Sequence, residues 1–373
     1  MALNSLLSRM RGDDGITKEV FCLNQEDGPF KPLLERYVVN KPNRWIWAFS
    51  TYYAQHHGLK KWVLIGVKLI RKVMQRLGHD PMQAQMRKEV GWINRAGYDA
   101  VVAYAEGVIT HFVAQVECRR KVAWIHIDYK RNLTYIGNAD ESWVYDRFDK
   151  IVIPSQFSLN SFNEVFPHLS SRTVAIQNII DEERILRLSN EQVEDCAVEK
   201  DGYLLVSIGR ICYEKQFFEI PLVAAALRDK GIRFKWMIIG GGSQVEMQMV
   251  RDKIKEHNVE SHVIMMGTKN NPYPYLKMSS LLVVTSISET FSYAIAEAKV
   301  LGVPIATTPF GTVREVIDEP MGGVIAELNG MADAIAALLC DKERFEACKM
   351  YLADSKVASM NNENIKKIEG LFE

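Results

Sequence analysis

The chain has 373 residues, which is too long for one ordinary hydrophobic core and fits two domains of typical size. Hydrophobic residues make up 47% and charged residues 25%, values that exclude a disordered protein. The 46 Lys and Arg residues balance the 46 Asp and Glu residues, so net charge argues neither for nor against a nucleic-acid partner. We predict no nucleic-acid partner.

Cysteine usage and hydropathy indicate the compartment. The six cysteines are scattered without a Cys-x-x-Cys pair, which predicts reduced thiols rather than disulfides or a zinc site. No run has the apolar length of a transmembrane helix, and no secretory signal pattern is present. We therefore expect a cytoplasmic protein.

The chain begins unusually for an α/β domain. Met1–Met10 is predicted as an amphipathic helix and Lys18–Leu23 as a strand. Such a domain normally begins with a strand that leads into the first helix through a glycine-containing turn. We expect that this first strand and its glycine-rich loop are missing. A late start codon, a truncated chain or a domain that lacks the strand would each explain this.

The segment 41–76 combines eight Lys and Arg residues with no acidic residue. Trp45, Trp47 and Trp62 are interleaved with them, as contact with an anionic membrane surface requires. The same composition suits an anionic acceptor, or a helical pair with an aromatic core and solvated lysines. The membrane interpretation predicts a peripheral protein on the inner face of the cell membrane.

Helices and strands then alternate through the first half of the chain. Predicted strands are Asp99–Tyr104, Lys121–Ile127, Lys150–Pro154 and Arg172–Gln177, and predicted helices are Gly107–Gln115 and Phe157–Val165. His126 lies at the carboxyl end of the second strand, where open parallel sheets bind their ligands. A histidine at a strand end is more often structural than catalytic. Its place at the edge of the expected cleft makes His126 a candidate nonetheless.

A second α/β series follows the polar, acidic stretch Asp181–Lys200, which we interpret as the connection between two domains. Predicted strands are 202–209, Arg233–Ile239, His262–Met266, Leu281–Ile287, Val303–Thr307 and Gly323–Ala326. Predicted helices begin near Lys215 and Ser292 and span Asn329–Leu339, Lys342–Leu352 and Val357–Phe372. We divide the chain into an N-terminal domain, 1–182, a C-terminal domain, 183–356, and a final helix, 357–373, that crosses back to the N-terminal domain.

The stretch Leu281–Ile317 contains two carboxylates on either side of a helix start. Glu289 lies in the loop after a strand, and Glu297 lies inside the helix that begins near Ser292. Free backbone N–H groups and the positive end of the helix dipole suit a phosphate there. Carboxylates accept hydrogen bonds from sugar hydroxyls, so the pattern indicates a nucleotide sugar. Two Glu residues at this spacing would by themselves more often be ordinary surface carboxylates.

Four features together resemble a known family. These features are Gly209-Arg210 with Lys215, the Gly240–Gly242 turn, the segment Asn271–Tyr275, and the Glu289 and Glu297 pair. They resemble the family 4 retaining glycosyltransferases of the GT-B fold, which build capsular, lipopolysaccharide and other surface polysaccharides. The resemblance covers nearly the whole chain and implies an α/β protein with two Rossmann-like domains facing a cleft.

The resemblance has two departures. Thr290 stands where the family usually has glycine after the first Glu, and the first strand with its glycine-rich loop is absent.

The resemblance implies roles for the charged residues. Arg210 and Lys215 resemble the cationic pair that binds the donor diphosphate and stabilises it as it leaves. Because the sequence has no Asp-x-Asp motif, we expect metal-independent transfer that requires no cofactor. Glu289 resembles the residue that binds hydroxyls of the transferred sugar, and Glu297 the residue that binds the ribose. His126 would lie across the cleft beside the donor sugar.

Further donor contacts follow from the same resemblance. Backbone N–H groups would contact the diphosphate at Phe291, Ser292 and Tyr293. Gly209, Gly240 and Gly241 would allow close approach of the backbone to the ligand. Thr268 would meet the base, and we favour UDP-sugars over GDP-sugars as co-substrate.

The predicted function is that of a retaining hexosyltransferase. It would move a hexose from a nucleotide diphosphate sugar to a lipid-linked or oligosaccharide acceptor in surface polysaccharide biosynthesis. Front-face attack, with the leaving phosphate accepting the acceptor proton, requires no protein nucleophile. Two alternatives stay open: a nucleotide-sugar 2-epimerase of similar architecture, and a catalytically silent, donor-binding partner subunit.

Overall fold

The computed structural model describes residues 2–9, 17–21, 37–38, 43–50, 58–136, 141–193, 202–354 and 357–372. Chain contacts divide the protein into two compact units. The first unit comprises Met1–Pro154, Leu159–Ile176 and Ile365–Glu373, and the second comprises Ser155–Ser158 and Gln177–Asn364. The domain limits at 182 and 356 inferred from sequence stay predictions.

The first unit contains a parallel sheet of four strands in the order β1-β2-β3-β4. The strands are β1 (Ala100–Ala103), β2 (Arg120–Trp124), β3 (Lys150–Ile153) and β4 (Thr173–Ala175). Each falls within or close to a stretch that the sequence predicts as a strand. Buried apolar runs with turn residues at both ends explain why these strands could be recognised.

The prediction of a strand at Lys18–Leu23 is wrong for residues 18–21, which are the part of this stretch that the structure describes. Val20 forms only an isolated bridge to Val38. The ring of Phe21 instead packs between Trp92 and Phe112, with centroids 5.4 and 5.7 Å away. Aromatic packing and single hydrogen bonds, from Val20 N to Tyr37 O and from Tyr98 Oη to Glu19, therefore hold this segment in place of a strand ladder.

Helices and one aromatic cluster complete the first unit. Its helices are α1 (Ala2–Arg9), α3 (Arg44–Ser50), α4 (Gly58–Arg76), α5 (Pro81–Ala96), α6 (Val108–Val113), α7 (Tyr129–Ile136), α8 (Ser142–Tyr145) and most of α9 (Gln156–Val165). Tyr129 and Tyr145 meet Phe162 edge to face at 5.3 and 5.2 Å, and all three side chains are buried. This cluster joins α7, α8 and α9 beside the sheet.

The second unit contains a parallel sheet of six strands in the order β7-β6-β5-β8-β9-β10. The strands are β5 (Tyr203–Ile208), β6 (Phe234–Ile239), β7 (Val263–Gly267), β8 (Leu281–Val284), β9 (Ile305–Thr307) and β10 (Gly323–Ile325). The chain builds outward from β5 in one direction and then, after β7, returns to β8 and builds outward in the other. Ligands of such doubly wound sheets bind at the carboxyl ends of the two strands where the direction changes, here β5 and β8.

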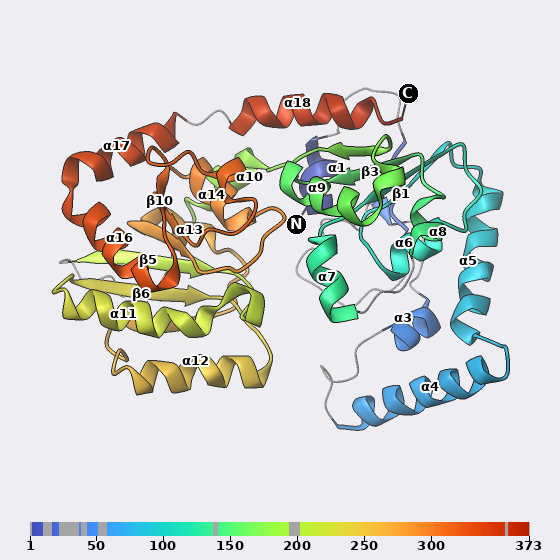
Figure 1. Ribbon diagram of the computed structural model, residues 1–373, viewed down its shortest axis with the longest axis horizontal. Helices are drawn as coiled ribbons and strands as arrows, with labels where there is room; N and C mark the ends of the chain where they lie inside the picture. The colour runs from blue at the N-terminus through green and yellow to red at the C-terminus, as the bar shows by residue number, and fades with distance from the viewer. Residues whose placement is uncertain are drawn as a thin grey trace. The chain divides into compact units, whose positions relative to one another are not determined.

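Both faces of this sheet are covered by helices, so its strands are apolar on both sides. Leu205, Trp236 and Val283 pack with α11 (Ile220–Asp229), α12 (Gln244–Glu256) and α16 (Leu328–Cys340). Val206 and Leu282 pack with α13 (Tyr273–Met278) and α14 (Tyr293–Val300) on the other face. Figure 1 shows α11 and α12 on one side of the strands and α13 and α14 on the other. The GT-B-like α/β class predicted from the sequence is thus confirmed.

The remaining elements of the second unit are helical. They are α10 (Glu182–Leu188), α15 (Val313–Val316), α17 (Lys342–Ala353) and α18 (Val357–Glu369), of which α18 ends in residues assigned to the first unit. The α10 helix lies in the stretch that the sequence suggested as a connection. It packs on α13 and α14.

The helix expected to begin near Lys215 starts later than predicted. Two short 3-10 helices, Tyr213–Lys215 and Phe217–Glu219, come first, and α11 begins at Ile220. Gln216 separates the two with a left-handed φ of 49°. Phe217 is buried in the core, and that packing stabilises a backbone conformation that local propensity disfavours.

Gly240 is a site where the fold excludes any side chain. A Cβ added there would lie 1.8 Å from the backbone oxygen of Gly209, and its φ is 153°. We expect Gly240→Ala to lower the free energy of unfolding by about 1–3 kcal/mol, measured by urea denaturation. Gly330→Ala is the control, because its Cβ would meet nothing within 4 Å in the helix α16. Equal stability of the two variants would contradict the close packing of the two glycine turns.

Candidate active site

The loops that follow β5 and β8 bring two predicted site residues together. Lys215 ends the first 3-10 turn after β5, and Glu289 lies in the loop after β8. Lys215 Nζ donates to Glu289 Oε1 in an ion pair. Ser286 Oγ donates to the same carboxylate oxygen at 2.8 Å. The Lys215 side chain is 27% exposed and that of Glu289 9%, so the pair lies at the surface with limited access to water.

Backbone contacts fix the two loops against each other. Ile287 N donates to Glu214 O at 2.8 Å, and Thr285 Oγ1 donates to Lys215 O at 2.6 Å. Thr312 Oγ1 donates to Glu289 O at 2.9 Å from the segment after β9. Hydrogen bonds on both sides thus hold the backbone that presents the ammonium and the carboxylate. Such positioning before a ligand arrives favours electrostatic catalysis.

Glycine residues let the neighbouring turns come close. Gly209 N donates to Ile239 O at 3.0 Å, and Ile211 N donates to Gly241 O at 2.8 Å. A Cβ on Gly241 would lie 2.7 Å from Thr268 Oγ1, so Thr268 borders the same turn. Gly209, Gly241 and Thr268 thus follow the carboxyl ends of β5, β6 and β7, and their contacts with a ligand stay predictions.

Arg210 projects from this edge as an exposed cation. Within the described ranges its side chain makes no hydrogen bond or ion pair, in contrast to Lys215. A guanidinium suits an anion with several oxygens, because its planar donors can bind two of them at once. That Arg210 and Lys215 together supply the positive charge of the site stays a prediction.

The helix that follows Glu289 begins where the sequence predicted. Ser292 is the N-cap of α14, with an extended backbone and no hydrogen bond from its side chain to the first turn. The rings of Phe291 and Tyr293 meet edge to face at 5.0 Å. The first N–H groups of α14 consequently lie directly after the Glu289 loop, and their contact with a diphosphate stays a prediction.

Glu297 has a different environment from Glu289. Its side chain is buried, and Tyr273 Oη donates to its Oε1 at 3.2 Å. Burial raises the pKa of Glu297 to about 7, and the Tyr273 hydrogen bond opposes that shift. Tyr273 belongs to an apolar cluster with Ile180 and Ile185, so the carboxylate faces a largely dry region. The two carboxylates of the predicted signature thus have separate partners.

Tyr273 is the residue that sequence reasoning missed. The segment Asn271–Tyr275 was recognised as part of a family pattern, but no role was assigned to the tyrosine. Its hydroxyl contact with Glu297 joins α13 to α14. The only available signal was its place in that segment, because the two residues are 24 positions apart in the chain.

His126 lies in the first unit, two residues after β2. Its backbone N donates to Glu106 Oε2 at 3.0 Å, and its ring lies 5.0 Å from Tyr104 and 6.5 Å from Trp124. Burial lowers the pKa of His126 below its ordinary value, with Glu106 acting in the opposite direction. The imidazole is therefore neutral at pH 7 and suited to accept or donate one hydrogen bond. Its role toward a donor sugar stays a prediction.

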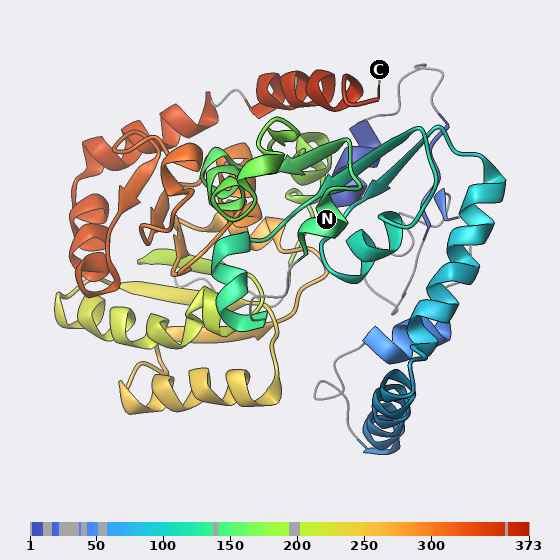
Figure 2. The same ribbon diagram turned by 45° about the vertical axis from the view of Figure 1, so that its right-hand side comes forward.

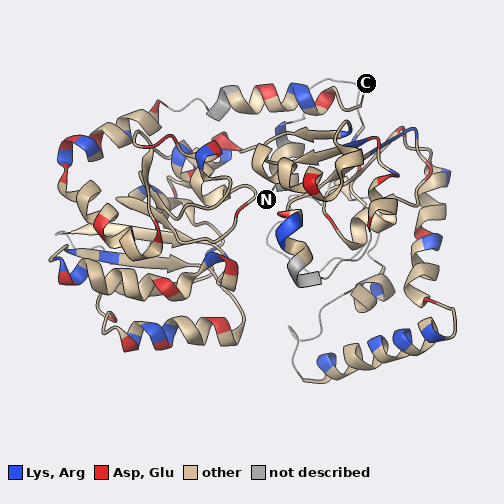
Figure 3. Cartoon of the chain, in the orientation of Figure 1, with Lys and Arg blue, Asp and Glu red and all other residues tan. Residues whose placement is uncertain are grey.

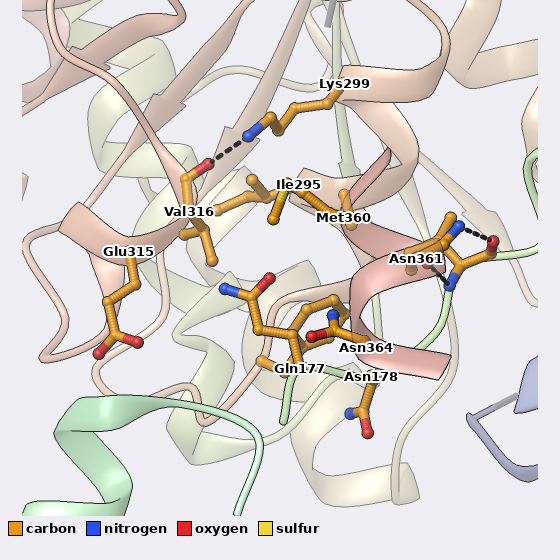
Figure 4. A pocket seen from close by; sticks show the side chains of 12 residues that line it. Gln177, Asn178, Ile295, Lys299, Glu315, Val316, Met360, Asn361 and Asn364 are labelled. Atoms are coloured by element: carbon orange, nitrogen blue, oxygen red, sulfur yellow. Dashed lines mark hydrogen bonds between the residues drawn. The ribbon is translucent and has the colours of Figure 1, made fainter. Parts of the chain in front are cut away.

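A small pocket of the second unit lies beside α14 and is lined by Phe291 and Ile295. Figure 4 shows Lys299, Asn361 and their neighbours around it, with Lys299 Nζ donating to Val316 O at 3.2 Å. Asn361 Nδ2 donates to Ile180 O at 2.8 Å. The cavity measures about 40 Å³, which is room for a water molecule or two and far too little for a nucleotide sugar.

Comparison with known proteins agrees with this geometry. Residues 189–352 match the family model described as glycosyl transferases group 1. An uncharacterised glycosyltransferase of Methanocaldococcus jannaschii is 24% identical over 240 residues, which are 60% of this chain and 58% of that protein. The N-acetylgalactosamine-N,N'-diacetylbacillosaminyl-diphospho-undecaprenol 4-alpha-N-acetylgalactosaminyltransferase of Campylobacter jejuni is 26% identical over 289 residues, 77% of this chain and 71% of that protein.

A solved structure extends the likeness to the whole fold. The Anabaena protein HepE, in a complex with UDP and glucose, superimposes with a TM-score of 0.70 at 18% identity. The comparison covers 99% of this chain and 95% of that one. The second unit thus resembles the group 1 glycosyl transferases over residues 189–352, and the solved structure shows the same fold over the chain. Its matched region includes Arg210, Lys215, Glu289 and Glu297.

The burial of Glu297 predicts a pH effect on stability. Its pKa is about 7 in the folded state against an ordinary 4.5, so between these values the folded protein retains a proton that the unfolded chain has lost. The free energy of unfolding therefore falls as pH rises through that window, by about 3 kcal/mol in total. We expect Glu297→Gln to remove this fall, measured as urea midpoints from about pH 5 to about pH 8.

The exposed Glu256 on α12 provides the matched control, and Glu256→Gln should keep the pH dependence of the wild type. Parallel curves for the wild type and Glu297→Gln would show that Glu297 does not titrate in this range.

Proposed function

We propose that this protein is a retaining hexosyltransferase that uses a nucleotide diphosphate sugar as donor. The observation on which the proposal rests is the contact between Lys215 and Glu289 at the carboxyl ends of β5 and β8. A cation for the leaving group and a carboxylate for sugar hydroxyls lie together at the place where doubly wound sheets bind ligands. The match of residues 189–352 to the group 1 glycosyltransferases supports the same conclusion.

The proposed reaction exchanges one bond at the anomeric carbon. The acceptor hydroxyl oxygen bonds to that carbon on the face from which the diphosphate departs, and the bond from the carbon to the diphosphate oxygen breaks. The acceptor proton passes to the departing diphosphate. Arg210 and Lys215 stabilise the charge that develops on this leaving group, because its negative charge grows as the bond breaks.

Glu289 and Glu297 act as hydroxyl acceptors in this proposal. Glu289 would bind hydroxyls of the transferred sugar while Lys215 holds its carboxylate in place, and Glu297 would bind the ribose. Neither serves as a nucleophile, so the two-carboxylate scheme of glycoside hydrolases does not apply. His126 is assigned to the donor sugar from the first unit.

The donor is proposed to be a UDP-sugar. The support is the fold likeness to HepE, whose structures were solved with UDP, with UDP and glucose, and with UDP-glucose. Thermal unfolding in a panel of nucleotide sugars provides the first test, since a true donor stabilises the folded state by mass action.

The acceptor is proposed to be lipid-linked or an oligosaccharide in surface polysaccharide biosynthesis. The Campylobacter jejuni relative has a name that specifies a diphospho-undecaprenol acceptor. Within the described ranges, each helix is too short or too polar to cross a lipid bilayer. We propose a cytoplasmic enzyme that meets its acceptor at the inner membrane surface through residues 41–76.

Lys215→Ala and Glu289→Ala test the site directly. We expect each to lower the turnover rate by at least about 100-fold, because removing one preorganised electrostatic group typically has this effect. The measurement is transfer of radiolabelled sugar from the stabilising donor to a lipid-linked acceptor. Lys253→Ala and Glu256→Ala, which remove an exposed ion pair on α12, are the matched controls. Full activity of Lys215→Ala or Glu289→Ala in folded protein would refute the assignment.

Metal removal tests how the leaving group is stabilised. With Arg210 and Lys215 supplying the positive charge, transfer should continue at an unchanged rate after dialysis against EDTA. Among the residues described, no three His, Cys, Asp or Glu side chains cluster as metal ligands would. Loss of activity that Mg²⁺ or Mn²⁺ restores would instead assign the diphosphate charge to a metal ion.

A further inference from the structure

The helix α4 presents a long apolar surface to solvent. Side chains that are 55–80% exposed recur at steps of three and four residues and therefore share one face of the helix. They are Leu59, Trp62, Val63, Leu69, Ile70, Val73 and, just beyond the helix end, Leu77. We call this surface the α4 stripe. The helix has 19 residues, so the stripe is about 28 Å long.

The opposite side of α4 is fixed to the first unit. Leu64 is buried, and Val67 packs on the core of this unit. Arg71 donates to both carboxylate oxygens of Asp80 at 3.0 and 2.8 Å, and Asp80 also caps α5 through Met82 N. The helices α3 and α5 lie against this side of α4 (Figure 1 and Figure 2). These contacts determine the rotation of α4 about its axis. The stripe, on the opposite side of the helix, therefore faces solvent.

Basic residues border the stripe along one edge. A rotation of about 100° per residue places Arg76 next to the stripe, and Lys61 and Lys72 about midway between the stripe and the buried Leu64. Neither α4 nor α3 contains an Asp or Glu residue. Accordingly, the charged residues of α4 in Figure 3 are all basic. The helix therefore combines three faces: one packed on the protein, one basic and one apolar.

We propose that α4 lies in the plane of an anionic lipid bilayer surface, with its stripe toward the acyl chains. Lys61, Lys72 and Arg76 would then lie at the level of the lipid phosphates, and the Trp62 indole would lie at the boundary that it favours. Six Lys and Arg residues in α4 prevent it from crossing the bilayer. An exposed apolar surface of this length is otherwise unfavourable in water.

Charge favours a bilayer over a second copy of this chain. Two α4 helices paired on their stripes would bring together two positively charged helices, with no acidic side chain on α4 or α3 to compensate. An anionic lipid surface compensates the same charges directly. The apolar stripe alone would suit either a bilayer or a second copy of the chain. The basic residues favour the anionic bilayer.

This inference deepens the proposed function and rests on it in one respect. A lipid-linked acceptor would be presented at the surface on which α4 lies. Docking itself requires neither donor nor transfer, so the two proposals fail separately.

Flotation of the full-length protein with vesicles tests the docking. Vesicles of phosphatidylcholine with phosphatidylglycerol are compared with vesicles of phosphatidylcholine alone. The stripe variant is Trp62→Glu with Ile70→Glu and Val73→Glu, and the charge variant is Lys61→Gln with Lys72→Gln and Arg76→Gln. We expect the wild type to bind the anionic vesicles and the charge variant to bind on the order of 100-fold more weakly. The stripe variant should lose binding, and added salt should weaken the wild type.

Matched variants elsewhere exclude a general effect of composition. Val245→Glu with Met350→Glu replaces two exposed apolar side chains of the second unit, and Lys253→Gln with Lys255→Gln replaces two lysines on α12. Both should bind vesicles like the wild type. Because all altered stripe residues are exposed, each variant should keep the thermal unfolding midpoint of the wild type.

Several results would overturn the docking proposal. The first is absence of wild-type binding to anionic vesicles. The second is binding by the stripe variant or the charge variant that equals that of the wild type. The third is a wild-type dimer in sedimentation that the stripe variant abolishes. Thermal stabilisation by the donor separates the two proposals. A stripe variant that keeps donor stabilisation but loses vesicle binding supports docking alone. Vesicle binding by a wild type that no nucleotide sugar stabilises would contradict the proposed donor and leave docking intact.

Discussion

The pairing of β5 with β8 is the constraint on which the candidate site depends. Leu205 lies opposite Leu281, and Val206 opposite Leu282, in the middle of a sheet that is buried on both faces. A shift of this register by one residue would turn each apolar side chain to the opposite face. The core therefore fixes where the two strands end, and the loops leave the sheet side by side. Lys215 and Glu289, which are 74 positions apart, meet for this reason.

The strands were predictable from the sequence because each is a short apolar run between turn residues. The site was predictable as residue types, since Gly209-Arg210, Lys215 and the two Glu residues resemble a known pattern. Their mutual contacts were not predictable, because those contacts depend on which strands become neighbours. The delayed start of α11 shows the same limit: Gln216 adopts a left-handed φ only because Phe217 packs into a core made of distant segments.

The basic aromatic segment illustrates what composition leaves open. Its tryptophans and phenylalanine are equivalent in a composition count, yet Phe49 of α3 is buried while Trp62 of α4 is 70% exposed. The exposure of Trp62 follows from the rotation of α4, which the burial of Leu64 and the Arg71 and Asp80 contact fix. Trp47, Tyr52 and Tyr53, which belong to the same segment, lie outside the residues and side chains that the structure describes.

The carboxylates of Glu289 and Glu297 differ in their hydrogen-bond partners and in their burial. Glu289 already has an ammonium and a hydroxyl beside it, so it is held ready as an acceptor. Glu297 has one hydroxyl donor, Tyr273, and is buried enough to be largely protonated below pH 7. A ribose that donated further hydrogen bonds to Glu297 would favour its charged form and lower its pKa. If Glu297 binds the ribose as proposed, donor binding and release of this proton are therefore linked.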